Sequence, residues 1–166
     1  SKSGLAIILS GLKGFESPKV MKEQYPTDSE VAASVLWSAC LLGDIEGKSI
    51  GDLGCGTGIL GIGALLLGAN KAVFIDSDKN ALETAKNSIS KLKSEGYNIG
   101  KAEFKCQDIS DVGKTKIDVV IQNPPFGTKK RHADTSFLEK ALEIAPVVYS
   151  FHKSESKGFL ERFSAG

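Results

Sequence analysis

Apolar residues recur along the chain with two alternating spacings, one typical of helices and one typical of strands. Helical spacing predicts helices over residues 5–10, 29–42, 60–67, 79–95 and 133–145. Short apolar runs predict strands over residues 49–53, 72–76, 103–106, 117–122 and 147–151, and we expect a last helix after residue 151. This alternation predicts a Rossmann-like, doubly wound α/β fold, with a mostly parallel sheet covered by helices on both faces.

The chain shows no linker, repeat or low-complexity tract that would divide it. Its 166 residues, 41% of them hydrophobic, fit one domain, with an N-terminal helical segment (residues 1–47) and a Rossmann-like core (residues 48–166). The dipeptide Thr27-Asp28 is a cap for the helix over residues 29–42. The apolar residues of this helix are Val31, Val35, Trp37, Leu41 and Leu42.

The amino-acid composition limits the classes of protein to which this chain can belong. The 21 Lys and Arg residues nearly balance the 20 Asp and Glu residues, so net charge does not indicate a general polyanion binder. No apolar run approaches the roughly 18 residues of a spanning helix, and the N-terminus does not read as a signal peptide. We expect a soluble intracellular protein, cytoplasmic or, in a eukaryote, nuclear. Three separated cysteines lack metal-ligand spacing and are predicted to be buried thiols, with no metal site: Cys40, Cys55 and Cys106.

A glycine-rich segment, Asp52-Leu53-Gly54-Cys55-Gly56-Thr57-Gly58, directly follows the first predicted strand. Glycines at every second position allow a tight turn and a close approach of the backbone to a ligand, although such a turn can also serve packing alone. The segment also matches the dinucleotide pattern Gly-x-Gly-x-x-Gly, but the Asp52 carboxylate would repel a pyrophosphate. S-adenosylmethionine, with a sulfonium and no phosphate, fits better.

Two later carboxylates are candidates for the rest of this cofactor. Asp76 ends the second predicted strand and is placed to accept hydrogen bonds from both ribose hydroxyls, as it also would in an NAD enzyme. Asp108 follows the third strand and is a candidate partner for the adenine amino group, with Ile109 in apolar contact with the ring. A helix-cap role for Asp108 explains its position equally well.

The motif Asn123-Pro124-Pro125-Phe126 follows the fourth predicted strand, whose loop faces the glycine loop if the two strands are neighbours. The prolines make the backbone rigid and extended. The Asn123 side-chain oxygen and the Pro124 carbonyl can accept both N–H bonds of a planar amino group, which aligns the nitrogen lone pair for methyl transfer. Phe126 can stack on a flat target, although a simple turn with a core phenylalanine is the alternative.

Basic residues follow this motif and suggest a rim that binds RNA phosphates, unless they form only a solvated loop. The candidates are Lys129, Lys130 and Arg131, with His152 and Lys153 at the end of the fifth strand. A protein methyltransferase acting on a glutamine side-chain amide needs the same pocket and remains an alternative. A catalytically silent scaffold and a dinucleotide oxidoreductase are the others.

Four segments resemble the methyltransferase-like family that makes N6-methyladenosine in small-subunit ribosomal RNA: Gly14-Phe15-Glu16, Glu23-Gln24-Tyr25-Pro26-Thr27, Asn123 to Lys129, and Tyr149 to Lys153. The resemblance implies S-adenosylmethionine as cofactor and RNA, ribosomal RNA in particular, as substrate. It also implies a cofactor shell formed by Gln24, Thr27, Gly54, Thr57, Ile59, Asp76, Asp108, Ile109 and Asn123.

The same resemblance implies two further features. Eukaryotic members of this family work with a small zinc-binding activator protein that covers an apolar sheet edge, so we expect an equivalent partner. The family's sheet usually has seven strands, whereas five are predicted here, so the C-terminal strand hairpin is expected to be missing.

Overall fold

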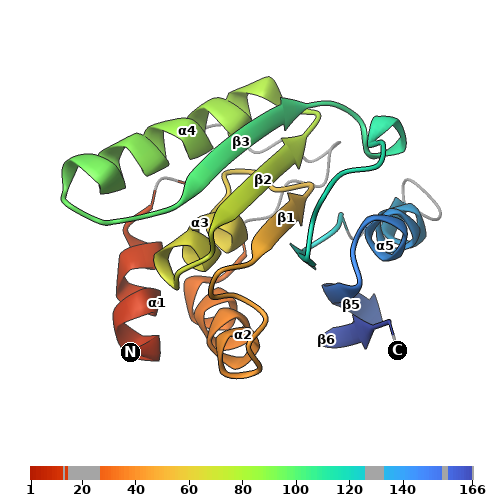
Figure 1. Cartoon of the computed structure of the whole chain (residues 1–166), viewed down its shortest axis with the longest axis horizontal. Helices are drawn as coiled ribbons and strands as arrows, with labels where there is room; N and C mark the ends of the chain where they lie inside the picture. The colour runs from red at the N-terminus through yellow and green to blue at the C-terminus, as the bar shows by residue number, and fades with distance from the viewer. Residues whose placement is uncertain (13, 15–26, 126–132, 155–156, 166) are drawn as a thin grey trace.

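Six strands form one sheet in the computed structural model, in the order β3-β2-β1-β4-β5-β6 (Figure 1). The structure describes residues 1–12, 14, 27–125, 133–154 and 157–165. The first five strands run parallel, and β6 runs antiparallel to β5. Their bounds are β1 Ser49–Leu53, β2 Lys71–Asp76, β3 Lys101–Cys106, β4 Val119–Gln122, β5 Val147–Ser154 and β6 Lys157–Ser164.

Helices occupy both faces of the sheet, as a doubly wound topology requires. Alternation along β2 shows the division, because Phe74 belongs to one apolar cluster while Val73 and Ile75 belong to the other. The first cluster packs under α1 to α4, and the second under α5 and the short helix η2. The helices are α1 Lys2–Ser10, α2 Ser29–Leu41, α3 Ile59–Leu66, α4 Lys79–Ser94, η2 Ile109–Asp111 and α5 Ala133–Ile144.

Most predicted elements are confirmed to within two residues, and β1 has the predicted bounds. The expected last helix is wrong, because residues 157–164 form strand β6, which pairs along its whole length with β5. In this strand Phe163 packs on the α5 face, and Phe159 stacks on His152 with ring centroids 5.2 Å apart. The sheet therefore continues beyond β5 by an antiparallel hairpin.

Burial differs from the apolar pattern in α2 and from the prediction for the cysteines. In α2, Val31, Leu41 and Leu42 are exposed, because the helix packs through smaller or neighbouring side chains. Those buried residues are Ala32, Ala33, Val35, Leu36 and Ala39. Of the three cysteines, only Cys55 is buried, while Cys106 is exposed at the end of edge strand β3. Among the described residues, no helix is long and apolar enough to cross a membrane.

Candidate active site

The strand order brings the two motifs to the same edge of the sheet. β1 pairs with β4 in parallel, with Ile50 opposite Val119 and Gly51 opposite Val120. The winding of the sheet reverses between these two strands, and their loops leave it at the carboxyl ends. The prediction that the loops after Asp52 and Gln122 come from neighbouring strands is confirmed.

The glycine loop has a backbone that other residues rarely adopt. Gly54, Gly56 and Gly58 have φ angles of 63°, 54° and 89°, all in the left-handed region. The loop is tied to the sheet because the Cys55 amide donates to the Ile75 carbonyl at 3.0 Å. Thr57 is half-buried between the last two glycines. This geometry leaves backbone without side chains at the end of β1.

Asp52 lies beneath the glycine loop and serves helix α3. Gly58 is the N-cap of α3 and has no side chain to satisfy the first amides of the helix. The Asp52 Oδ2 atom supplies that acceptor, because it receives the Gly61 amide at 2.9 Å. Asp52 is only 2% exposed. Burial raises the pKa of Asp52 well above its usual value, the Gly61 hydrogen bond opposes this, and the nearby Asp76 charge adds to it.

Burial also dominates the chemistry of the neighbouring thiol. It raises the pKa of Cys55 well above its usual value, and the Asp52 and Asp76 charges raise it further. The Cys55 Sγ atom lies 3.4 Å from the Gly56 carbonyl, to which it donates. The thiol is therefore a neutral packing group within the loop.

Asp76 connects the glycine loop to the start of α4. Its Oδ2 accepts the Gly56 amide at 2.8 Å, and its Oδ1 accepts the Asp78 amide at 2.8 Å. Asp78 in turn caps α4 by accepting the Asn80 amide at 3.0 Å. Asp76 is half-buried, so its carboxylate lies at the surface of the site with a fixed orientation.

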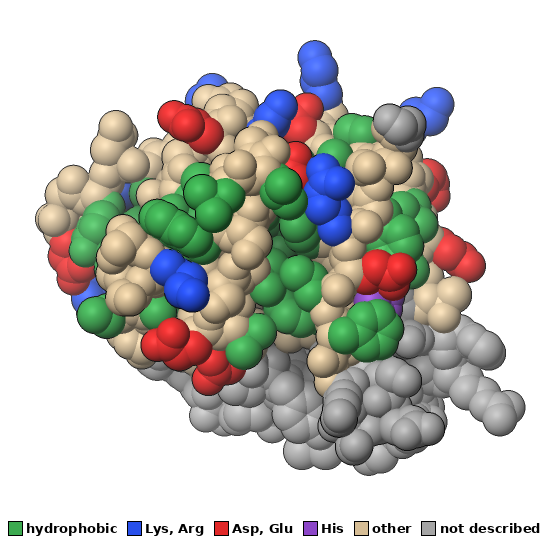
Figure 2. All heavy atoms as spheres, turned by 90° about the horizontal axis from the view of Figure 1, so that it is seen from below, with side chains coloured by type: hydrophobic (Ala, Val, Ile, Leu, Met, Phe, Trp, Pro, Cys, Tyr) green, Lys and Arg blue, Asp and Glu red, His purple; other side chains and the backbone are tan. Residues whose placement is uncertain are grey.

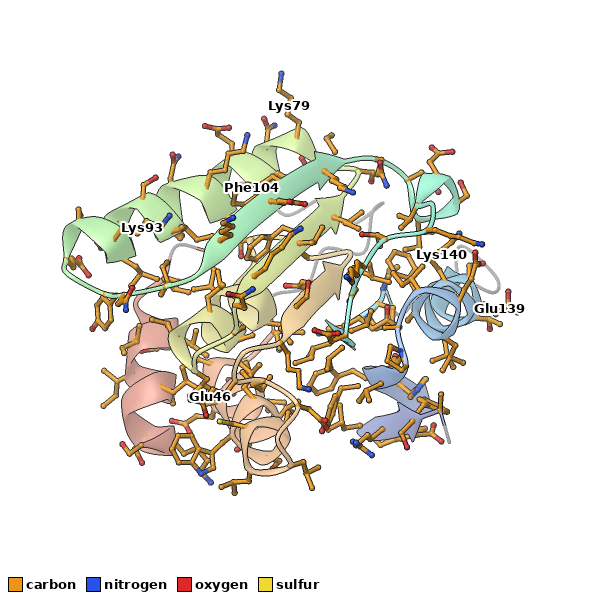
Figure 3. All side chains as sticks on the ribbon, viewed as in Figure 1. Glu46, Lys79, Lys93, Phe104, Glu139 and Lys140 are labelled. Carbon is orange, nitrogen blue, oxygen red and sulfur yellow. The ribbon has the colours of Figure 1, made fainter. Side chains whose placement is uncertain are left out.

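Asp108 and Ile109 lie in the loop after β3. The Asp108 Oδ1 atom accepts the Ser110 amide at 2.9 Å and caps η2, so its alternative role as a helix cap is present in the structure. Ile109 is half-buried against the α5 face. Lys140 of α5 (Figure 3) fixes this loop, because its ammonium donates to the Val112 carbonyl at 2.8 Å.

The side chain of Asn123, at the end of β4, is held through the nitrogen of its amide group. Its Nδ2 donates to the Thr27 Oγ1 at 2.9 Å. Its Oδ1 is buried and has no hydrogen-bond partner within the part of the chain that the structure describes. Pro124 is buried and Pro125 half-buried, so the backbone after Asn123 is packed. An acceptor oxygen is thus left available beside the glycine loop.

A buried polar pair directly precedes the motif and was not predicted. The Gln122 Nε2 atom donates to the Ser150 Oγ at 3.0 Å, and both side chains are fully buried between β4 and β5. The Gln122 Oε1 atom has no partner among the described residues. In the sequence, the polar pair is indicated by a glutamine at the end of an otherwise apolar strand, because a buried polar side chain needs a partner.

Several predicted residues fall outside the described ranges: Gln24, Phe126, Lys129, Lys130 and Arg131. His152 is described and does not extend freely into solvent. Its ring lies between Phe159 and Phe163, with centroids 5.2 Å and 6.3 Å away, and its Nε2 is 3.6 Å from the Glu161 Oε2. The backbone of Lys153 belongs to β5, and its side chain is outside the described set.

These features fit the predicted cofactor. Left-handed glycines turn the backbone tightly at the end of β1, Asp76 offers a fixed carboxylate, and the Asn123 Oδ1 atom is a buried acceptor without a partner among the described residues. Asp52 fits a contact role less well, because it is buried under the loop and its influence on a cation would act through space.

Comparison with known proteins gives the family. Residues 29–147 match the model of the methyltransferase small domain. An uncharacterized protein of Methanocaldococcus jannaschii is 39% identical over 173 residues, which cover 98% of this chain and 75% of that protein. The rRNA N(6)-adenosine-methyltransferase Mettl5 of Drosophila melanogaster is 38% identical over 157 residues, covering 93% of this chain and 73% of the relative.

A solved structure agrees with the sequence relatives. The crystal structure of a "putative RNA methyltransferase" from Pyrococcus horikoshii superposes with a TM-score of 0.83 at 46% identity, covering 93% of this chain and 74% of that one. The predicted Rossmann-like methyltransferase fold is therefore confirmed. The chain belongs to the methyltransferase small domain family of S-adenosylmethionine-dependent methyltransferases, in the group whose members include rRNA N6-adenosine-methyltransferases.

Proposed function

We propose that the protein transfers a methyl group from S-adenosylmethionine to the exocyclic N6 amino group of adenine in RNA, and that this RNA is ribosomal. The observation that carries the proposal is the Asn123 Oδ1 atom, a buried acceptor without a described partner at the end of β4. Such an acceptor needs a hydrogen-bond donor, and an amino group is a donor that fits it. The name of the Drosophila relative supports adenine in ribosomal RNA as the target.

The cofactor supplies a methyl group bonded to a positively charged sulfur. The glycine loop would meet it at the end of β1, where Gly54, Gly56 and Gly58 allow the tight left-handed turn of the backbone. Asp76 is held by two backbone amides, and we assign its carboxylate to the ribose hydroxyls. Asp108 and Ile109 are assigned to the adenine ring.

The acceptors at the end of β4 make the target nitrogen reactive. The lone pair of an adenine amino group is delocalised into the ring, so the nitrogen is a weak nucleophile. Asn123 Oδ1 and the Pro124 carbonyl accept its two N–H bonds and direct the lone pair toward the methyl group. As the nitrogen–carbon bond forms, the carbon–sulfur bond would break and the sulfur would leave as a neutral thioether, S-adenosylhomocysteine. Positive charge grows on the nitrogen during transfer, which strengthens both hydrogen bonds and stabilises the transition state more than the bound substrate, and the methylated nitrogen then loses one proton to water.

Nucleoside analysis tests this proposal directly. The protein is incubated with tritiated S-adenosylmethionine and an in vitro transcribed small-subunit ribosomal RNA, which is then digested to nucleosides. We expect the label in N6-methyladenosine. Label in a different nucleoside contradicts adenine N6 as the target. Label only in added ribosomal protein contradicts RNA and favours methylation of a glutamine amide, which the same acceptors fit.

A protein partner is a second part of the proposal. It is supported by large apolar side chains that are exposed to solvent on α1 and at the C-terminal end of α2. Ile7, Leu41 and Leu42 are 71%, 76% and 62% exposed. Figure 2 shows hydrophobic side chains among polar ones on the side seen from below in Figure 1. Co-expression with a small zinc-binding activator protein is expected to raise the Tm. An unchanged Tm and no co-purification would count against a partner.

A further inference from the structure

Thr27 and Asn123 form a contact that joins distant parts of the chain. They are 96 residues apart, and the Asn123 amide donates to the Thr27 hydroxyl at 2.9 Å. Both residues are half-buried. The contact occupies the nitrogen end of the Asn123 amide and so leaves the oxygen end facing the site.

Thr27 itself is held in a fixed place. It precedes Asp28, the N-cap of α2, whose Oδ1 accepts the amides of Glu30 and Val31 at 2.9 Å and 3.1 Å. Helix α2 then packs into the core through Ala32, Leu36 and other buried residues. The Thr27 hydroxyl is therefore presented by a capped helix end rather than by a free loop.

The orientation of the Asn123 amide decides which group the site can receive. The two ends of an amide have nearly the same shape but opposite hydrogen-bonding roles. With Nδ2 on Thr27, Oδ1 faces the target and accepts its N–H. In the opposite orientation, an N–H would face the N–H of the target amino group, which is repulsive.

We propose that Thr27 is a positioning residue for methyl transfer, because its hydroxyl accepts from Nδ2 and so holds the Asn123 amide in the plane in which Oδ1 faces the target amino group. This inference rests on the proposed function of the site. It gives Thr27 a role in the chemical step, in addition to the cofactor contact that the family resemblance implies. Loss of one such hydrogen bond is expected to lower kcat by about five- to tenfold.

Substitutions at position 27 separate this role from cofactor binding. Thr27→Val keeps the shape and removes the hydroxyl, whereas Thr27→Ser keeps the hydroxyl. We expect Thr27→Val to lower kcat for adenine methylation of the transcribed ribosomal RNA by a larger factor than it raises the Kd for S-adenosylmethionine, measured by calorimetry. Thr27→Ser should restore most of the loss. A wild-type kcat in Thr27→Val, or a weaker Kd with unchanged kcat, would overturn the inference.

Two further variants distinguish positioning from structure. Asp28→Ala removes the cap of α2 but keeps the Thr27 hydroxyl and Asn123, so it should lower the Tm and lower kcat by less than Thr27→Val does. In an Asn123→Asp background both ends of the side chain accept hydrogen bonds, so orientation matters less. In the Asn123→Asp background, Thr27→Val should therefore lower kcat by less than half of the factor by which it lowers kcat in the protein that has Asn123. An equal factor in both backgrounds would contradict the inference.

The inference and the proposed function fail in different ways. A wild-type protein that leaves RNA adenine unmethylated would refute the proposed function before any variant is compared. An active wild type whose rate is insensitive to Thr27→Val refutes only the role of Thr27.

Discussion

Gly61 is the position where the packing of the cofactor-binding half can be tested most sharply. It lies in α3, directly against the fully buried ring of Phe74 on β2. A Cβ at position 61 would stand 2.3 Å from the Phe74 Cε1 and 2.8 Å from its Cζ. The ring cannot move away easily, because Phe104 stacks on it at 5.0 Å, and Lys86 lies over Phe104 at 5.5 Å. Figure 3 shows Phe104 on edge strand β3, which α4 flanks.

The Gly61→Ala substitution sets two effects of opposite sign against each other. Replacing a helical glycine with alanine stabilises a helix by about 1 kcal/mol. Overpacking a closed core costs about 1–3 kcal/mol, and moving the Gly61 amide away from Asp52 weakens a charged hydrogen bond worth about 1.5–3 kcal/mol. We expect a net loss of about 1–3 kcal/mol, which corresponds to a Tm lower by about 2–10 °C for a chain of this size.

Urea unfolding followed by the fluorescence of Trp37, the single tryptophan, measures this change. Gly4→Ala in α1 is the matched control, because a Cβ there would meet only the flexible Ser1 Oγ, at 3.1 Å. The control should be stabilised by about 0.5–1 kcal/mol. If Gly61→Ala is as stable as wild type or gains as much as Gly4→Ala, the proposed packing of α3 on Phe74 is wrong.

Three further predictions concern the site and its support. Gly54→Ala places a Cβ 2.8 Å from the Phe137 Cε1 at a φ of 63°, so we expect a lower Tm and at least tenfold weaker binding of S-adenosylmethionine by calorimetry. Tyr149→Phe removes the 2.5 Å hydrogen bond to buried Asp44 and should cost about 1–3 kcal/mol in urea unfolding at pH 8. Burial and the Asp44 contact raise the pKa of Tyr149 to about 12, so this advantage of wild type is present below pH 10 and should shrink as pH rises from 10 toward 12. Asp52→Asn keeps an acceptor for helix α3 but removes the charge, so the Tm should change little while cofactor affinity falls. Because the pKa of Asp52 is raised, wild-type affinity should approach that of Asp52→Asn as the pH is lowered, and equal affinities at all pH values would remove the charge from the account.

The strands and helices of the core could be predicted because their apolar runs are short, regular and separated by glycine or polar residues. The last segment could not, since Phe159 and Phe163 are four residues apart, a spacing that fits one face of either a helix or a strand. Pairing with the long strand β5 decides between them, and pairing is a contact that local sequence does not contain.

The contact face of α2 is not marked by its largest apolar residues. The side of the helix that faces α1 and α3 carries Ala32, Ala33 and Ala39, which allow the helices to approach closely. Larger residues such as Leu41 stay exposed at its end. The spacing of these small residues along the sequence is the feature that indicates the contact face of the helix.

The positions of the site motifs followed from the sequence, but the hydrogen bonds within the site did not. Asp52 was interpreted as a charge for the cofactor, whereas it also replaces the cap that Gly58 cannot supply. The contact between Thr27 and Asn123 spans 96 residues and has no local pattern. Such contacts depend on how α2 docks beside β4, which only the folded chain defines.

The central claim is that the acceptor at the end of β4 carries the methyl transfer, separately from the loop that binds the cofactor. Asn123→Ala tests it when methylation of RNA adenine and binding of S-adenosylmethionine are measured in parallel on the same preparation. Loss of the Oδ1 acceptor, one of the two that the target amino group requires, is expected to lower transfer by at least a hundredfold. We predict this loss together with a Kd for S-adenosylmethionine within about threefold of wild type. Transfer at the wild-type rate in Asn123→Ala would contradict the account.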